Sequence, residues 1–231
     1  MKIAWVLWIA ALVLQAGCGE EARDRVPVQG VARDAMPKDG NEALQWLLEG
    51  NARFAEDRTQ HLHEGLRRRA QLVEGQHPAA VVLGCADSRV PPELVFDAGL
   101  GDLFVVRVAG NLADDDEAGS IEYAVDHLDV PLVLVLGHEG CGAVTAALGA
   151  TEGEAQELSR LLESMKPALR EIDPTLPMEE RVRLGVDANV RHSVARLQAI
   201  VEREGGAKPA PGFRIVGGVY ELDSGRVRLL D

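Results

Sequence analysis

The sequence is poor in cysteine, in aromatic residues and in positive charge, and each shortage excludes a class of protein. Three cysteines in 231 residues are too few for a fold held together by disulfide bonds. Aromatic residues make up only 4%, and two of the three tryptophans, Trp5 and Trp8, stand near the N-terminus. Acidic residues outnumber basic ones by 37 to 24, which gives a formal net charge of −13. Because phosphate binding needs a basic surface, nucleic acid is excluded as a main partner.

The rest of the composition is that of a globular domain. Hydrophobic residues make up 46% of the chain and charged residues 26%, which is neither the balance of a disordered chain nor that of a collagen. We find no internal repeat and no low-complexity segment. The chain is long enough to bury a core that needs no disulfide or structural metal to stabilise it.

Residues 1–17 are predicted to be a signal peptide. One basic residue precedes an apolar run from Ile3 to Leu14, which is followed by small residues and Cys18. The run is too short for a comfortable transmembrane helix. The position of Cys18 resembles the lipobox of bacterial lipoproteins, although Gln15 stands where that motif usually has leucine. We therefore expect an exported protein of the periplasm or cell envelope, anchored by a lipid on Cys18. The alternative is an ordinary cleaved signal with an incidental cysteine.

Residues 18–38 have mixed charges and two prolines and are predicted to be a tether or N-terminal arm, so that a single domain covers residues 39–231. In this domain, short continuous apolar runs alternate with segments of helical periodicity. Such runs are typical of strands that are buried on both faces of a parallel sheet. They lie at residues 79–84, 103–108 and 131–137.

Helical spacing of the apolar residues predicts the elements between and after these runs. Gly50 is expected to interrupt the first helix. A terminal hairpin is predicted at residues 213–221 and 226–229. The expected helices cover residues 42–56, 64–73, 118–128, 142–148, 154–170 and 178–203. The resulting fold class is α/β, with a mostly parallel central sheet flanked by helices and an N-terminal helical arm.

Three metal-binding side chains follow two of the predicted strands. Cys85 ends the first apolar run, while His138 and Cys141 follow the run at 131–137. In open α/β sheets the functional site lies beyond the carboxyl ends of the strands, so these residues converge if the two strands are neighbours. Two thiolates and one imidazole are a zinc set, and three protein ligands leave a fourth position open for catalysis. Taken alone, the same residues also fit a buried cysteine and a hydrogen-bonded histidine without metal.

The wider sequence resembles the β-class carbonic anhydrases. The segments CADSRV, FVVRVAGN, SIEYA and GH-x-x-CGA occur in the order and at the spacing of that family. The resemblance implies one zinc ion per chain, with Cys85, His138 and Cys141 as its ligands. It also implies that Asp87 and Arg89 form the family's catalytic Asp–Arg dyad.

The resemblance further implies a substrate pocket, which in that family is shared across a dimer interface. Gln76 matches a family glutamine that donates a hydrogen bond to carbon dioxide, and Phe104 and Tyr123 match apolar wall residues. For the two aromatic residues, plain core packing is the alternative. Gly142 follows Cys141, so its amide could bind the anion at a helix N-terminus. A homodimer or a higher even oligomer is therefore expected.

These observations predict reversible, zinc-dependent hydration of carbon dioxide to bicarbonate. Zinc-bound hydroxide would attack carbon dioxide, and Asp87, aimed by Arg89, would orient that hydroxide. One alternative is a hydrolase of the same fold for carbonyl sulfide or carbon disulfide. Another is a non-catalytic zinc-binding surface protein, against which the presence of Asp87, Arg89 and Gln76 argues, since mere binding needs none of them.

Overall fold

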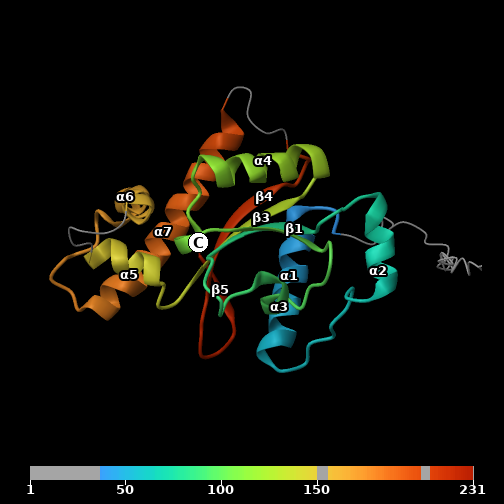
Figure 1. The fold of residues 1–231 in the computed structure, drawn as a ribbon, viewed down its shortest axis with the longest axis horizontal. Helices are drawn as coiled ribbons and strands as arrows, with labels where there is room; N and C mark the ends of the chain where they lie inside the picture. The colour runs from blue at the N-terminus through green and yellow to red at the C-terminus, as the bar shows by residue number, and fades with distance from the viewer. Residues whose placement is uncertain (1–36, 150–155, 204–208, 231) are drawn as a thin grey trace, which may run out of the picture.

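The computed structural model describes residues 37–149, 156–203 and 209–230 of the chain (Figure 1). The predicted signal peptide, Cys18 and nearly all of the predicted N-terminal arm lie outside the described residues. In the described part, no helix combines the length and the apolar character needed to cross a membrane.

One sheet of five strands forms the centre of the described structure, in the order β2-β1-β3-β4-β5. Neighbouring strands among the first four are parallel, and β5 is antiparallel to β4. The prediction of a mostly parallel sheet with a terminal hairpin is therefore confirmed. The strands are β1 (Ala80–Gly84), β2 (Leu103–Arg107), β3 (Leu132–His138), β4 (Arg214–Tyr220) and β5 (Val227–Leu230).

Helices cover both faces of this sheet (Figure 1). One face packs against α4 and α7, with α5 and α6 packed on α7, and the other face packs against α1 and α3. Strand β1 is buried along its whole length because its alternate residues, such as Val81 and Val82, belong to the two different cores. The helices are α1 (Gly40–Ala55), α2 (Leu66–Gln71), α3 (Pro92–Val95), α4 (Asp115–Leu128), α5 (Gly142–Gly149), α6 (Gln156–Leu169) and α7 (Met178–Glu202), with 3₁₀ turns η2 (Leu72–Glu74) and η3 (Ala109–Asn111).

The expected interruption of the first helix at Gly50 is wrong. Helix α1 runs through this residue without a break, and Asp39 caps its start by accepting hydrogen bonds from two backbone amides. A Cβ atom at Gly50 would lie 2.0 Å from the carbonyl oxygen of Phe96. The absence of a side chain at Gly50 therefore allows α1 to pack closely against the chain that follows α3. Sequence alone does not distinguish such a contact glycine from a helix breaker.

The order of the strands creates a switch point between β1 and β3. After β1 the chain forms β2 on one side, and it then returns to form β3 on the other side of β1. Gly84 is in register with Leu136, so the residues that follow the two strands emerge next to each other. In open α/β sheets this is where ligands bind.

Candidate metal centre

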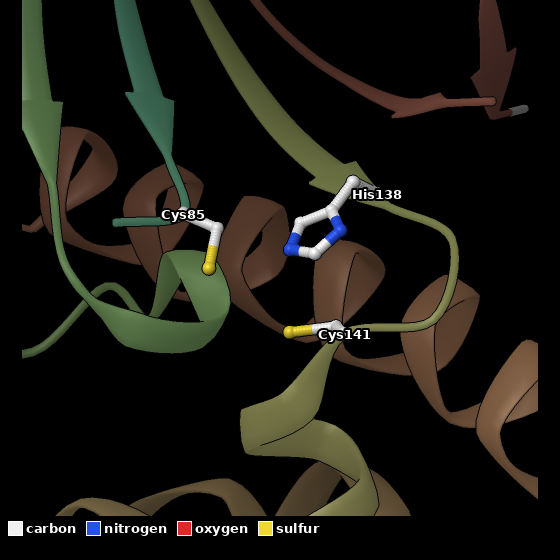
Figure 2. A group of neighbouring side chains, drawn as sticks. All are labelled: Cys85, His138 and Cys141. Carbon is white, nitrogen blue, oxygen red and sulfur yellow. The ribbon is translucent and has the colours of Figure 1, made fainter. Parts of the chain in front are cut away.

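Cys85, His138 and Cys141 come together at the carboxyl ends of β1 and β3, as the sequence predicted. The sulfur atoms of the cysteines and a ring nitrogen of His138 all lie within 4.8 Å of one another. All three residues are buried, and His138 has no exposed surface. Figure 2 shows the three side chains pointing toward one another, with Cys85 after β1, His138 at the end of β3 and Cys141 at the start of α5. Two sulfurs and an imidazole are donors that suit zinc.

The hydrogen bonding of His138 leaves one ring nitrogen for a metal. Its Nδ1 lies 2.9 Å from the carbonyl oxygen of Glu139, and because a carbonyl only accepts, Nδ1 carries the proton. Its Nε2 is buried and has no hydrogen-bond partner among the described residues. A buried polar atom without a partner is costly in a folded protein. A metal ion coordinated by Nε2 removes this cost, and the Nδ1 bond is the usual support of a histidine ligand.

The two thiols have unequal proton affinities in the metal-free protein. The pKa of Cys85 is lowered because its sulfur accepts hydrogen bonds, first from the Cys141 thiol and also from the Gly110 amide. The Gly110 nitrogen lies 3.2 Å from that sulfur. The pKa of Cys141 is raised by its hydrogen bond to Cys85 and by burial. The Cys85 thiol therefore loses its proton more easily than the Cys141 thiol, and a metal ion would bind both sulfurs as thiolates.

Asp87 and Arg89 form a close pair beside the cluster. Arg89 donates to the Asp87 carboxylate from Nε at 2.9 Å, from Nη2 at 2.7 Å and from its backbone amide at 2.9 Å. The Arg89 side-chain hydrogen bonds, followed by that of its backbone amide, hold the pKa of Asp87 well below its usual range. Asp87 Oδ2 lies 3.8 Å from Nε2 of His138. An ionised carboxylate therefore faces the position that a metal ion would occupy.

Arg107, at the end of β2, holds the loop that carries both Cys85 and Asp87. Its Nε donates to the carbonyl oxygen of Cys85 at 2.9 Å, and its Nη2 donates to that of Asp87 at 2.6 Å. The sequence does not single out this role, because a main-chain carbonyl is present at every residue and leaves no motif.

Three of the predicted substrate residues do not lie at the metal cluster of the same chain. Gln76 is exposed and precedes β1, so the strand separates it from Cys85 by roughly 17 Å at the usual rise per residue. Phe104 pairs with Val81 near the start of β1, and its ring centroid lies 6.3 Å from that of Tyr123, which is 50% exposed. Gly142, in contrast, begins α5 directly after Cys141. The roles of these four residues stay predictions.

Comparison with known proteins gives the same result as the geometry. The carbonic anhydrase family matches residues 80–227. Carbonic anhydrase 2 of Mycobacterium tuberculosis is 44% identical over 198 residues, which cover 83% of this chain and 94% of that protein.

Solved structures share the fold. A β-carbonic anhydrase of Aspergillus fumigatus superposes with a TM-score of 0.63 at 29% identity and covers 81% of this chain and 90% of its own. A tetrameric β-carbonic anhydrase of Sordaria macrospora superposes with a TM-score of 0.60 at 25% identity, covering 81% and 96%. The chain therefore belongs to the β class of the carbonic anhydrase family, and it is a zinc-dependent carbonate dehydratase that hydrates carbon dioxide reversibly to bicarbonate.

Proposed function

We propose that Cys85, His138 and Cys141 hold the zinc ion of this carbonic anhydrase and that Asp87, aimed by Arg89, orients the attacking oxygen. The observation that carries the proposal is the buried cluster itself, in which Nε2 of His138 has no hydrogen-bond partner among the described residues. Three ligands from the protein leave a fourth position for the reacting group. When bound, zinc supplies a nucleophile near neutral pH by lowering the pKa of a water molecule.

The charge of the ligand set determines how strongly that water is acidified. Two thiolates and a neutral imidazole compensate the charge of the ion completely, whereas three histidines leave it with two positive charges. We therefore expect a higher pKa for the water here than in a three-histidine site. The activity of this protein should therefore rise at a higher pH than the activity of an enzyme with a three-histidine zinc site.

Asp87 acts through its ionised state. A carboxylate without a proton only accepts hydrogen bonds, so the hydroxyl proton of the nucleophile points toward Asp87. A lone pair of the attacking oxygen is then left for the carbon atom of carbon dioxide. Arg89 keeps Asp87 in this state, because its guanidinium stabilises the charged form through two side-chain hydrogen bonds.

A second copy of the chain would complete the substrate pocket. Gln76 and Tyr123 are exposed, and neither lies at the cluster of its own chain. In a homodimer or a higher even oligomer, the pocket of the neighbouring protomer would be lined by Gln76, Phe104 and Tyr123. The amide of Gly142 would face the bound anion. The Sordaria macrospora relatives are described as tetrameric.

Export and lipid anchoring belong to the same proposal and rest on the sequence alone. If Cys18 carries the lipid, Cys18→Ser releases the protein from membranes in a detergent partition assay. An unchanged distribution of this variant would remove the anchor from the proposal.

Stopped-flow hydration of carbon dioxide, combined with elemental analysis of zinc, tests the roles of the site residues. We expect one zinc ion per chain in the wild type and its loss in Cys85→Ser. Asp87→Asn keeps the zinc but lowers kcat by ~10² or more, the usual size of the effect of a positioned acid–base group. Asp116→Asn removes an exposed carboxylate on α4 and serves as the control. Zinc binding without turnover in the wild type would instead support a non-catalytic zinc protein.

A further inference from the structure

A buried side chain of α7 holds the turn that contacts Cys85. Gly110 donates its amide hydrogen to the sulfur of Cys85 at 3.2 Å, and its carbonyl oxygen accepts a hydrogen bond from Nδ2 of Asn189 at 2.7 Å. Asn189 is 1% exposed. We propose that Asn189 is a positioning residue of the metal centre, which keeps the Gly110 amide on the Cys85 thiolate. The inference rests on the proposed role of Cys85 as a zinc ligand.

The backbone conformation of Gly110 explains why it needs to be held. This residue lies in η3 with φ 74° and ψ 18°, in the left-handed region that glycine adopts readily. Because glycine adopts many other conformations equally well, its own preference does not fix the direction of its amide. The hydrogen bonds on its two sides, to Cys85 and from Asn189, select the observed conformation.

The close packing of α7 on the sheet brings Asn189 within reach of the turn. A Cβ atom at Gly137 in β3 would lie 2.6 Å from a methyl carbon of Val190, the residue after Asn189. The absence of that atom lets α7 approach β3, and Figure 2 shows α7 running behind the three metal-binding side chains. The short side chain of Asn189 is therefore long enough to contact Gly110.

A hydrogen bond to a thiolate changes how much negative charge the sulfur donates to a bound metal ion. The N–H group draws negative charge from the sulfur, so the sulfur donates less charge to the ion. The same bond fixes the position of the sulfur. Loss of partners outside the ligand shell lowers metal affinity or activity by about 10- to 100-fold in metalloproteins.

Ser193 provides a matched control on the same helix, one turn after Asn189. It is fully buried, and its hydroxyl donates to the carbonyl oxygen of Asn111, in the same turn, at 3.2 Å. Ser193→Ala thus removes a buried hydrogen bond to η3 while leaving both contacts of Gly110 in place. If Asn189 had a purely structural role, its substitution and that of Ser193 would have the same effect on the metal centre.

The test compares Asn189→Leu and Ser193→Ala in the full chain, loaded with cobalt(II) or zinc. The sulfur-to-cobalt charge-transfer absorption reports the charge on the thiolates, and transfer of zinc to a chromogenic chelator reports how firmly the ion is held. For Asn189→Leu we expect the absorption at lower energy and release of zinc about tenfold faster than in the wild type. Ser193→Ala should match the wild type in both measurements. If Asn189→Leu does not fold, Asn189→Ala replaces it.

Equal spectra and release rates for the Asn189 and Ser193 variants would overturn the inference alone, provided that Cys85→Ser weakens the charge-transfer absorption. If Cys85→Ser leaves that absorption unchanged, Cys85 is not a ligand, and the proposed site and the inference fail together.

Discussion

Replacing Arg107 by methionine tests how much the metal centre depends on a residue that coordinates nothing. The substitution keeps an unbranched side chain of similar length but removes both hydrogen bonds to the loop of Cys85 and Asp87. A hydrogen bond contributes about 0.5–1.5 kcal/mol net, and we use the middle of this range because Arg107 is exposed. Two such bonds give a loss of about 2 kcal/mol in the free energy of unfolding.

Expressed as a free energy, the effect of this variant on catalysis should be about as large as its effect on stability. A loss of about 2 kcal/mol lowers Tm by about 4–8 °C in a domain of this size. Because both Cys85 and Asp87 sit on the released loop, small displacements add up at the reacting centre. We expect kcat to fall by about tenfold to a hundredfold, since a shift of about 1 Å can cost ~10² in rate.

The assays are stopped-flow hydration of carbon dioxide and thermal unfolding, with zinc content measured in parallel. Arg203→Met is the matched control, because it removes the ion pair between Arg203, at the end of α7, and Glu122 on α4. Such exposed pairs contribute about 0–1 kcal/mol. Arg107→Lys should recover only part of the activity, since one ammonium group replaces a planar fork. If Arg107→Met has the kcat and Tm of Arg203→Met, zinc coordination alone holds the loop and our reasoning is wrong.

Three further outcomes are expected. Because the pKa of Asp87 lies below its usual value of about 3.9, its charge stabilises the fold above about pH 4, and this contribution is lost only as the pH falls through the lower folded value. Asp87 thus takes up no proton between about pH 6 and pH 9. A slope greater than one in a plot of log kcat/KM against pH, which means that more than one proton is involved, would contradict this. Gly50→Ala should lower Tm by about 5 °C because its Cβ meets a backbone oxygen. Gly119→Ala in α4, where a Cβ meets nothing within 4 Å, should raise Tm instead, and equal shifts would show that packing at Gly50 is not tight. After removal of zinc in air, Cys85 and Cys141 should form a disulfide, and a titration that still finds both thiols would argue against their proximity.

The local pattern of the sequence was sufficient for the fold class and for a candidate zinc set of three residues, whereas the resemblance to the β-class carbonic anhydrases was needed to choose zinc over a metal-free cysteine and histidine. Continuous apolar runs identify β1 and β3 because strands covered on both faces have no polar side, and a similar run identifies the edge strand β2, which is only half-buried. Cys85 and His138 directly follow two of these runs, and parallel strands end at the same edge of a sheet. Their convergence therefore depended only on whether β1 and β3 are neighbours, which the structure confirms.

The tertiary structure alone decided which residues support that centre. Arg107, Asn189 and the carbonyl group of Glu139 act through main-chain atoms, and the oxygen that Asn189 contacts is 79 residues away along the chain. Main-chain groups are identical at every position, so no spacing in the sequence marks such contacts. The placement of Gly50 against Phe96 is of the same kind. The sequence by itself determined the types of the ligands and their placement after two strands, whereas long-range packing made these strands neighbours and determined what holds the ligands in place.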